Sequence, residues 1–238
     1  MKIKNNILTI CLLWLLCLGG CDANVETKEQ TATKQQTNEE GKADIVQTNE
    51  HTQTIVFFGN SLTAGYGLEP DQAFPALIQN RIDSLNLSYK VVNAGVSGET
   101  SAGGKSRIDW LLRQPIDIFV LELGANDGLR GIDPSSTYQN LQTIIQKVRE
   151  KNPNVRIVLA GMQMPPSMGQ NFTQEFREVY TRLAEDENVE LIPFLLEGVA
   201  GISDLNQSDG VHPTVEGQKI LAENVWEVLA PILKENAS

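Results

Sequence analysis

The strongest constraint on the fold of this chain is an alternation of two kinds of segment that begins after residue 53. Short, continuous apolar segments alternate with longer segments in which apolar residues recur at helical spacing. The continuous segments have the length and composition of strands that are buried on both faces of a sheet. We predict five such strands, at residues 54–58, 89–92, 116–123, 155–160 and 189–193.

The intervening segments predict amphipathic helices, because their apolar residues are three or four positions apart. This periodicity covers residues 73–85, 138–148, 171–184 and 215–233, and it is weaker at 101–112, where Gly103 and Gly104 dilute the first turn. Repeats of strand and helix predict a three-layer α/β/α, flavodoxin-like fold. Its five-stranded parallel sheet should have the order 2-1-3-4-5, with a crevice at the carboxyl ends of the strands.

The N-terminus predicts export from the cytoplasm. Lys2 and Lys4 precede an uncharged apolar segment at residues 7–18. A segment of about a dozen residues is too short to span a bilayer of roughly 30 Å, so it is typical of a signal-peptide core. The following Leu-Gly-Gly-Cys resembles a bacterial lipobox, which implies that residues 1–20 are a lipoprotein signal peptide and that Cys21 is lipidated. The alternative is an ordinary cleavage site that happens to precede a cysteine.

Lipidation of Cys21 would account for the cysteine content. Cys11 and Cys17 would leave with the signal peptide, so no thiol would remain for a disulfide, a zinc site or a nucleophile. Residues 21–53 are mainly Thr, Lys, Gln, Glu and Asn, and we expect a disordered tether. If Cys21 carries more than one acyl chain, the tether is stably anchored to a membrane of the bacterial cell envelope, facing the periplasm or the exterior.

Residues 54–238 are enough for one domain with a sizeable core. The formal net charge of the whole chain is −11, which argues against nucleic acid as a partner because phosphates would be repelled. Nothing in the sequence requires more than a monomer.

The candidate catalytic residues start from the histidines, of which the chain has only two. His51 lies in the polar tether, whereas His212 follows Asp209 by three positions in Ser-Asp-Gly-Val-His-Pro-Thr. An imidazole with a nearby carboxylate is the orienting half of a nucleophilic triad. The best candidate for the hydroxyl is Ser61, in Gly-Asn-Ser-Leu-Thr-Ala-Gly-Tyr-Gly directly after the first predicted strand.

Two more polar loops follow predicted strands. Gly98 lies in the loop after the second strand, and Asn126 lies in the loop after the third. Each motif has a simpler interpretation when it is taken alone. Ser61 could cap a helix, Gly98 and Asn126 could form turns, and His212 could be a surface residue. Their occurrence together, at the same predicted edge of the sheet, favours one shared site.

These four blocks, in this order and spacing, resemble the SGNH hydrolases, also called the GDSL esterase/lipase family, over the whole folded domain. The resemblance is greatest to the thioesterase I/lysophospholipase L1-like arylesterase branch. It implies that Ser61 is the nucleophile, that His212 is the general base and later the acid, and that Asp209 orients the imidazole. It also implies an oxyanion hole formed by the backbone N–H groups of Ser61 and Gly98 and the side-chain amide of Asn126. No metal and no cofactor are implied.

The residues around Ser61 differ from two known sequence motifs, that of the resembled family and that of the α/β-hydrolases. The usual Asp of the family is Asn60 here, and we expect a changed hydrogen bond in the turn rather than a loss of activity. In an α/β-hydrolase the position of Thr63 would be the second Gly of Gly-x-Ser-x-Gly. The strained elbow of that fold is therefore not expected.

The predicted function is a serine esterase that hydrolyses carboxylic esters or thioesters through an acyl-enzyme, with aryl esters, short acyl esters and lysophospholipids as candidate small-molecule substrates. One alternative is a carbohydrate O-deacetylase, and another is a binding module without activity. An apolar crevice would favour acyl or aryl esters, whereas Trp, Asp and Asn at its rim would favour sugars. Met162, Met164, Pro165 and Pro166 could line such a crevice or could pack within a loop.

Overall fold

All five predicted strands are present in the computed structural model, which describes residues 52–236. The strands are β1 (Gln53–Gly59), β2 (Tyr89–Asn93), β3 (Ile118–Glu122), β4 (Arg156–Ala160) and β5 (Glu190–Ile192). They form one sheet in the order β2-β1-β3-β4-β5, and every neighbouring pair is parallel. The predicted fold class and strand order are confirmed.

The central strands are continuous in apolar residues because both of their faces are covered. Side chains alternate between the faces of a strand, so neighbouring residues reach different layers. Phe57 contacts Phe74 edge to face, with ring centroids 5.4 Å apart. Phe58 points the other way, where the Arg107 guanidinium lies 3.9 Å from its ring centroid. Both phenylalanines of β1 are fully buried.

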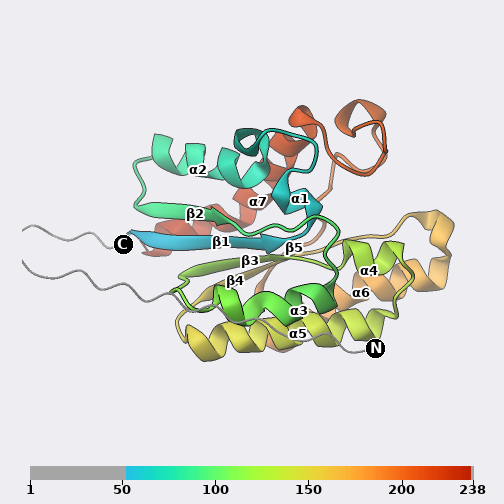
Figure 1. The fold of residues 1–238 in the computed structure, drawn as a ribbon, viewed down its shortest axis with the longest axis horizontal. Helices are drawn as coiled ribbons and strands as arrows, with labels where there is room; N and C mark the ends of the chain where they lie inside the picture. Colours follow the sequence, from blue (N-terminus) through green and yellow to red (C-terminus); the bar gives the residue numbers. More distant parts are fainter. Residues whose placement is uncertain (1–51, 237–238) are drawn as a thin grey trace, which may run out of the picture. The chain divides into compact units, whose positions relative to one another are not determined.

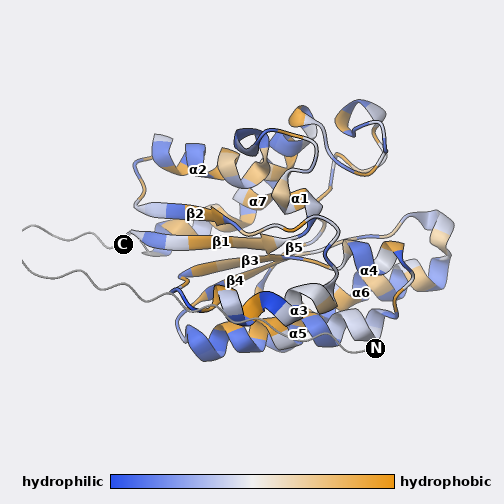
Figure 2. Ribbon diagram, in the orientation of Figure 1, coloured by the Kyte–Doolittle hydropathy of each residue, from blue (hydrophilic) through white to orange (hydrophobic). Residues whose placement is uncertain are grey.

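Helices form the two outer layers. They are α1 (Ser61–Ala64), α2 (Phe74–Ser84), α3 (Ser101–Leu111), α4 (Ala125–Leu129), α5 (Pro134–Lys151), α6 (Gln170–Glu187) and α7 (Val215–Asn236). α2 and α7 pack together over one face of the sheet, and α3, α5 and α6 cover the other face (Figure 1). Figure 2 shows the resulting pattern, with hydrophobic strands at the centre and hydrophilic surfaces on the outer sides of the helices.

The weakly predicted helix α3 illustrates how packing overrides propensity. Thr100 caps it by accepting a hydrogen bond from the N–H of Gly103. A Cβ on Gly104 would lie 2.3 Å from Leu123 and 3.1 Å from Phe58. The missing side chain therefore lets the helix lie close to the sheet, and the same glycine that weakens the helical pattern is required by the core.

The short helices α1 and α4 were not predicted, and they directly follow the carboxyl ends of β1 and β3. The predicted signal peptide, Cys21 and all but the last two residues of the predicted tether lie outside the described residues. Between residues 52 and 236, no helix is both long and apolar enough to span a bilayer.

Candidate functional site

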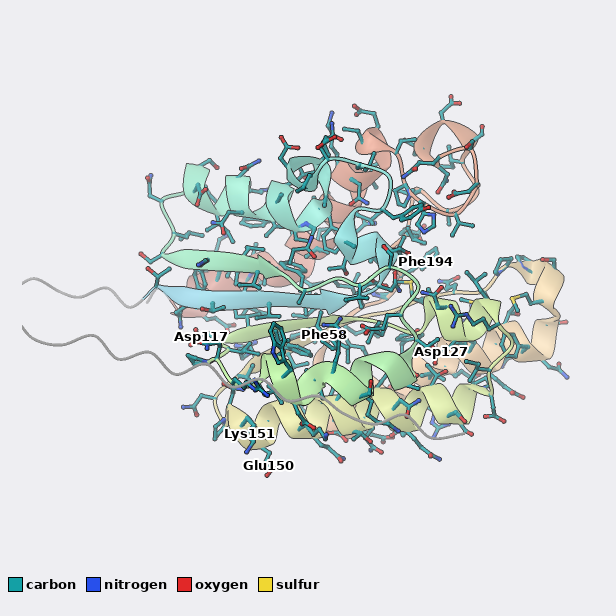
Figure 3. All side chains as sticks on the ribbon, in the orientation of Figure 1. Phe58, Asp117, Asp127, Glu150, Lys151 and Phe194 are labelled. Carbon is teal, nitrogen blue, oxygen red and sulfur yellow. The ribbon has the colours of Figure 1, made fainter. Side chains whose placement is uncertain are left out.

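The four predicted polar loops lie at the carboxyl-terminal edge of the sheet. Figure 3 marks this edge with Asp127 and Phe194, while Asp117 and Lys151 lie toward the opposite end of the strands. The loops follow β1, β2, β3 and β5, as expected for a doubly wound fold with its crevice at this edge.

The three predicted triad residues are in line. The Oγ atom of Ser61, the first residue of α1, lies 3.0 Å from Nε2 of His212. The other ring nitrogen, Nδ1, lies 2.6 Å from Oδ2 of Asp209. A hydroxyl, an imidazole and a carboxylate at these distances form the proton-transfer chain of a serine hydrolase. The other histidine, His51, lies outside the described residues.

Asp209 is held by its own loop. Its Oδ1 accepts hydrogen bonds from the backbone N–H of Val211 at 2.9 Å and of His212 at 3.0 Å. The hydrogen bonds from the His212 backbone and ring, and then from Val211, hold the pKa of Asp209 well below its usual range. The carboxylate is therefore ionised at neutral pH.

The histidine has a second set of contacts that the sequence did not indicate. The ring of Tyr66 lies 4.6 Å from the ring of His212, centroid to centroid. Gln207 donates from its backbone to the carbonyl of His212 at 2.7 Å, and from its side chain to the carbonyls of Tyr66 at 2.7 Å and Pro213 at 3.0 Å. These bonds connect the loop of the nucleophile to the loop of the histidine.

Ser61 is presented by an unstrained turn. Asn60 caps α1, because its side-chain Oδ1 accepts a hydrogen bond of 2.9 Å from the N–H of Leu62. Among residues 52–236, only Asn86 and Asn188 are non-glycine residues with a positive φ. Ser61 is therefore outside the left-handed region, in agreement with the absence of an α/β-hydrolase elbow that was predicted from Thr63.

A buried carboxylate lies beneath this turn. Oε2 of Glu122 accepts from the N–H of Asn60 at 3.0 Å, the N–H of Thr63 at 3.3 Å and the hydroxyl of Thr63 at 2.7 Å, and its Oε1 accepts from Nδ2 of Asn60 at 2.6 Å. A Cβ on Gly59 would lie 2.5 Å from the carboxylate, so glycine makes room for it. The available signal was an acidic residue inside an otherwise continuous apolar segment.

Burial raises the pKa of Glu122 from 4.5 to about 7, against the opposing effect of the hydrogen bonds from Thr63 and Asn60. Between these two pH values the native Glu122 therefore holds a proton that the unfolded chain has lost, so stability decreases as pH rises toward 7. Above about pH 7 Glu122 is ionised in the native state as well. Relative to Glu122→Gln, the wild-type free energy of unfolding should fall by up to about 3 kcal/mol between pH 4.5 and about 7. Urea unfolding at several pH values measures the difference, and parallel pH profiles for the two proteins would contradict it.

Two of the three predicted oxyanion residues, Gly98 and Asn126, come from loops that are hydrogen-bonded to each other. The side-chain amide of Asn126 donates to the carbonyl of Glu99 at 3.0 Å, and Arg130 donates to the carbonyl of Gly98 at 3.1 Å. An amide group has two N–H donors, so Asn126 keeps a second one for a substrate. Within residues 52–236, the backbone N–H groups of Ser61 and Gly98 have no acceptor.

Gly98 lies in the left-handed region, with a φ of +79°. This conformation favours glycine, although a Cβ placed there would meet no protein atom within 4 Å. Gly98 is also absent from the described lining of the crevice, whereas Ser61, Asn126 and His212 belong to it.

Asp127 fixes the relative positions of these two loops. This buried carboxylate accepts hydrogen bonds from the N–H of Ser101 at 2.8 Å, from its hydroxyl at 2.5 Å and from the hydroxyl of Thr137 at 3.4 Å. It therefore connects the helix that carries Asn126 to the start of α3, just after Gly98.

The triad lies in a crevice of about 600 Å³. Most of its lining is apolar and includes Leu62, Ala125, Leu129, Met162, Met164, Pro165, Pro166, Phe194, Leu196, Ala200 and Val211. The four residues whose role was left open, at positions 162 and 164–166, all line it. In the described part of the chain, no tryptophan lines the crevice, whereas the polar residues Asn60, Asn126, Gln163, Asn206 and Asp209 do. No group of three or more His, Cys, Asp or Glu side chains in this part is arranged to hold a metal ion.

Comparison with known proteins gives consistent matches. Residues 57–220 match the sequence profile of the GDSL-like lipase/acylhydrolase family. The protein named esterase TesA from Pseudomonas aeruginosa is 42% identical over 219 residues, which cover 92% of this chain and 98% of the relative. The protein named thioesterase 1/protease 1/lysophospholipase L1 from Escherichia coli K12 is 36% identical over 185 residues, which cover 77% of this chain and 86% of the relative.

A solved structure supports the same comparison. The psychrotrophic esterase EstA from Pseudoalteromonas sp., inhibited by monoethylphosphonate, superimposes with a TM-score of 0.72 at 33% identity. The match covers 76% of this chain and 99% of that structure.

Proposed function

The chain belongs to the GDSL-like lipase/acylhydrolase family, and from this premise we propose that it is a serine hydrolase that cleaves carboxylic esters and thioesters through an acyl-enzyme intermediate. The observation that carries the proposal is the 3.0 Å contact between Ser61 Oγ and His212 Nε2, with Asp209 behind the imidazole and an apolar crevice in front of the serine.

The proposed reaction begins with proton transfer. His212 takes the hydroxyl proton as Ser61 Oγ attacks the carbonyl carbon, and Asp209 stabilises the imidazolium that forms. The tetrahedral intermediate collapses when His212 returns the proton to the leaving alcohol or thiol. A water molecule activated by the same imidazole then hydrolyses the acyl-serine.

The negative oxygen of the tetrahedral intermediate needs donors that are already in place. The backbone N–H groups of Ser61 and Gly98 and the second amide N–H of Asn126 are the proposed donors. The hydrogen bond from Asn126 to Glu99 fixes the direction of the Asn126 amide, and the bond from Arg130 to the carbonyl of Gly98 holds the Gly98 loop in place before a substrate arrives. Such preorganised donors stabilise the transition state without reorganisation during the reaction.

Replacing Asn126 with alanine should therefore lower kcat by about 100- to 1,000-fold, with a smaller effect on KM, because the donor acts mainly on the developing oxyanion. Steady-state hydrolysis of p-nitrophenyl butyrate measures both constants. A variant with wild-type kcat would exclude the Asn126 amide from the oxyanion hole.

The lining of the crevice favours acyl or aryl groups over sugars. Its walls are methionine, proline, leucine and phenylalanine side chains, which would exclude water from an apolar chain. Recognition of an acetylated sugar would instead need several polar groups around the hydroxyls, and apart from the proposed catalytic residues and Asn60 the crevice offers only Gln163 and Asn206 among the described residues. The relatives named esterase and thioesterase/lysophospholipase agree with this preference.

One substrate panel tests the proposal. The purified protein is assayed on p-nitrophenyl esters of increasing acyl length, an acyl thioester, a lysophospholipid and an acetylated sugar. Preference for acyl or aryl substrates would support the proposal, whereas preference for the acetylated sugar would indicate the O-deacetylase alternative. Hydrolysis of none of them would indicate a binding module without activity.

We also propose that the enzyme is anchored to a membrane of the cell envelope through lipid on Cys21, with residues 21–53 as a tether. The support is the sequence alone, with its short apolar segment followed by Leu-Gly-Gly-Cys. Cys21→Ser should move the protein from the membrane fraction to the soluble fraction, because a lipid anchor holds it there. Fractionation followed by immunoblotting measures this, and unchanged membrane retention would refute the anchor.

A further inference from the structure

The geometry points to a positioning role for Asn60 and Glu122 as one unit beneath the nucleophile. We propose that this amide–carboxylate pair, with a single negative charge on Glu122, sets the direction of Ser61 Oγ and of the Ser61 backbone N–H. The proposal rests on the proposed function of Ser61. The pair joins the end of β3 to the start of α1 through a contact of 2.6 Å between Asn60 Nδ2 and Glu122 Oε1.

The hydrogen bonds indicate that Glu122 is ionised and show which way the amide of Asn60 is oriented. Glu122 receives four hydrogen bonds, all from Asn60 and Thr63, and it donates none. An ionised carboxylate accepts only, so it satisfies all four donors at once. This is the form of Glu122 above its raised pKa of about 7, so the kinetic comparisons below are made at alkaline pH. The amide of Asn60 is equally constrained, because its Nδ2 donates to Glu122 while its Oδ1 accepts from the N–H of Leu62.

An aspartate at position 60, the residue usual in this family, would form a different pair. Two carboxyl groups in direct contact cannot both be ionised, so one of them would have to hold a proton. Asn60 removes that requirement. The pair of this chain therefore keeps its charge on β3, and a neutral amide lies next to the serine, with Asn60 Oδ1 at 3.4 Å from Ser61 Oγ.

The unit controls the nucleophile because Ser61 lies between its contact points along the chain. Glu122 accepts a hydrogen bond from the backbone N–H of Asn60, which precedes Ser61, and another from the backbone N–H of Thr63, which follows it. A displacement of the serine by about 1 Å from its bonding position can cost on the order of 100-fold in rate. A substitution that breaks the hydrogen bond between Asn60 and Glu122 should therefore lower kcat, with little change in KM.

Exchanging the two functional groups gives a sharp test. Glu122→Gln places an amide against the amide of Asn60, and Asn60→Asp places a carboxyl against Glu122. Each single variant should lower kcat by about tenfold or more, which corresponds to the loss of about one well-made buried hydrogen bond. The double variant N60D/E122Q restores one donor facing one acceptor and the same net charge, so its kcat should return to within about threefold of wild type.

A matched control is the exposed amide–carboxylate pair of α6, in which Gln174 Nε2 donates to Glu178 Oε1 at 2.9 Å. The same exchange there, Q174E/E178Q, should leave kcat and KM unchanged. The free energy of unfolding of the wild type, Asn60→Asp, Glu122→Gln and the double variant provides a second readout that does not depend on activity. In this double-mutant cycle, the effects of the two substitutions on stability should be strongly non-additive, as expected for groups in direct contact.

The outcomes separate the proposals. Rescue of both kcat and stability in N60D/E122Q supports the positioning unit. Rescue of stability with kcat still low in the double variant would overturn the positioning role, and a double variant no better than the worse single one would overturn the unit itself. If the wild type hydrolyses no ester, the proposed function fails and the positioning role falls with it, while the unfolding cycle still decides whether the pair is one unit.

Discussion

Replacing Ser61 with alanine should lower the turnover number on p-nitrophenyl esters by on the order of a millionfold, because the nucleophile of a triad has no substitute. The hydroxyl lies 3.0 Å from His212 Nε2, so its removal leaves the imidazole with no group to activate at this position. Only the stabilisation from the oxyanion donors and from substrate binding would remain. The measurement is steady-state hydrolysis, together with labelling by a phosphonate that forms a covalent bond with active-site serines.

The control is Ser106→Ala, because Ser106 is exposed on α3 and donates only to the carbonyl of Gly103. That variant should keep wild-type activity and phosphonate labelling. The Ser61→Ala protein should unfold at nearly the wild-type temperature, so loss of fold would not explain the result. Comparable rates for the wild type and Ser61→Ala would exclude Ser61 as the nucleophile.

Replacing Asp209 with asparagine should lower kcat by roughly 10,000-fold while leaving the shape of the site intact. The carboxylate contacts ring Nδ1 of His212 at 2.6 Å and so keeps Nε2 free to accept the serine proton. An amide can present a donor instead, which favours the wrong tautomer of the imidazole. It also removes the negative charge that stabilises the imidazolium.

The pH dependence adds a check on this assignment. Since hydrogen bonds from His212 and Val211 keep the pKa of Asp209 well below its usual range, Asp209 stays ionised as an assay is made more acidic. The loss of activity on the acid side should therefore not come from protonation of Asp209. Asp204→Asn, in the exposed turn just before this loop, is the matched control and should retain full activity. A kcat within tenfold of wild type for Asp209→Asn would refute the orienting role.

The fold was accessible from the sequence because burial leaves a periodic signal. The central strands are covered on both faces and the helices on one, so the two patterns differ along the chain. The predicted ends of the helices and strands were less accurate, since each end depends on a few individual contacts. α5 begins at Pro134, where Asp133 accepts a hydrogen bond from Ser135, four residues before the apolar period begins. No hydrophobic pattern reports such a cap.

The candidate site was accessible in part, for a related reason. Ser61, Asn126, Asp209 and His212 stand out because polar residues and glycines follow apolar segments at one edge of the sheet. Glu122 was hidden inside the third apolar segment, since the pattern reports burial and not hydrogen bonding. The contacts of Tyr66 with Gln207 and His212 have no signal in the sequence, because residues about 140 positions apart meet only after folding.

The apolar wall of the crevice has a consequence for how this enzyme can change. Met162 and Met164 come from the segment after β4, which carries none of the proposed reacting groups, and Phe194 and Leu196 lie directly after β5, well before Asp209 in the same connection. Substitutions there can alter which acyl chain fits while the serine, the imidazole and their supports keep their geometry. Substrate preference and reaction chemistry are therefore separately evolvable, and selection for new esters can proceed at the wall while the proton-transfer machinery is inherited unchanged.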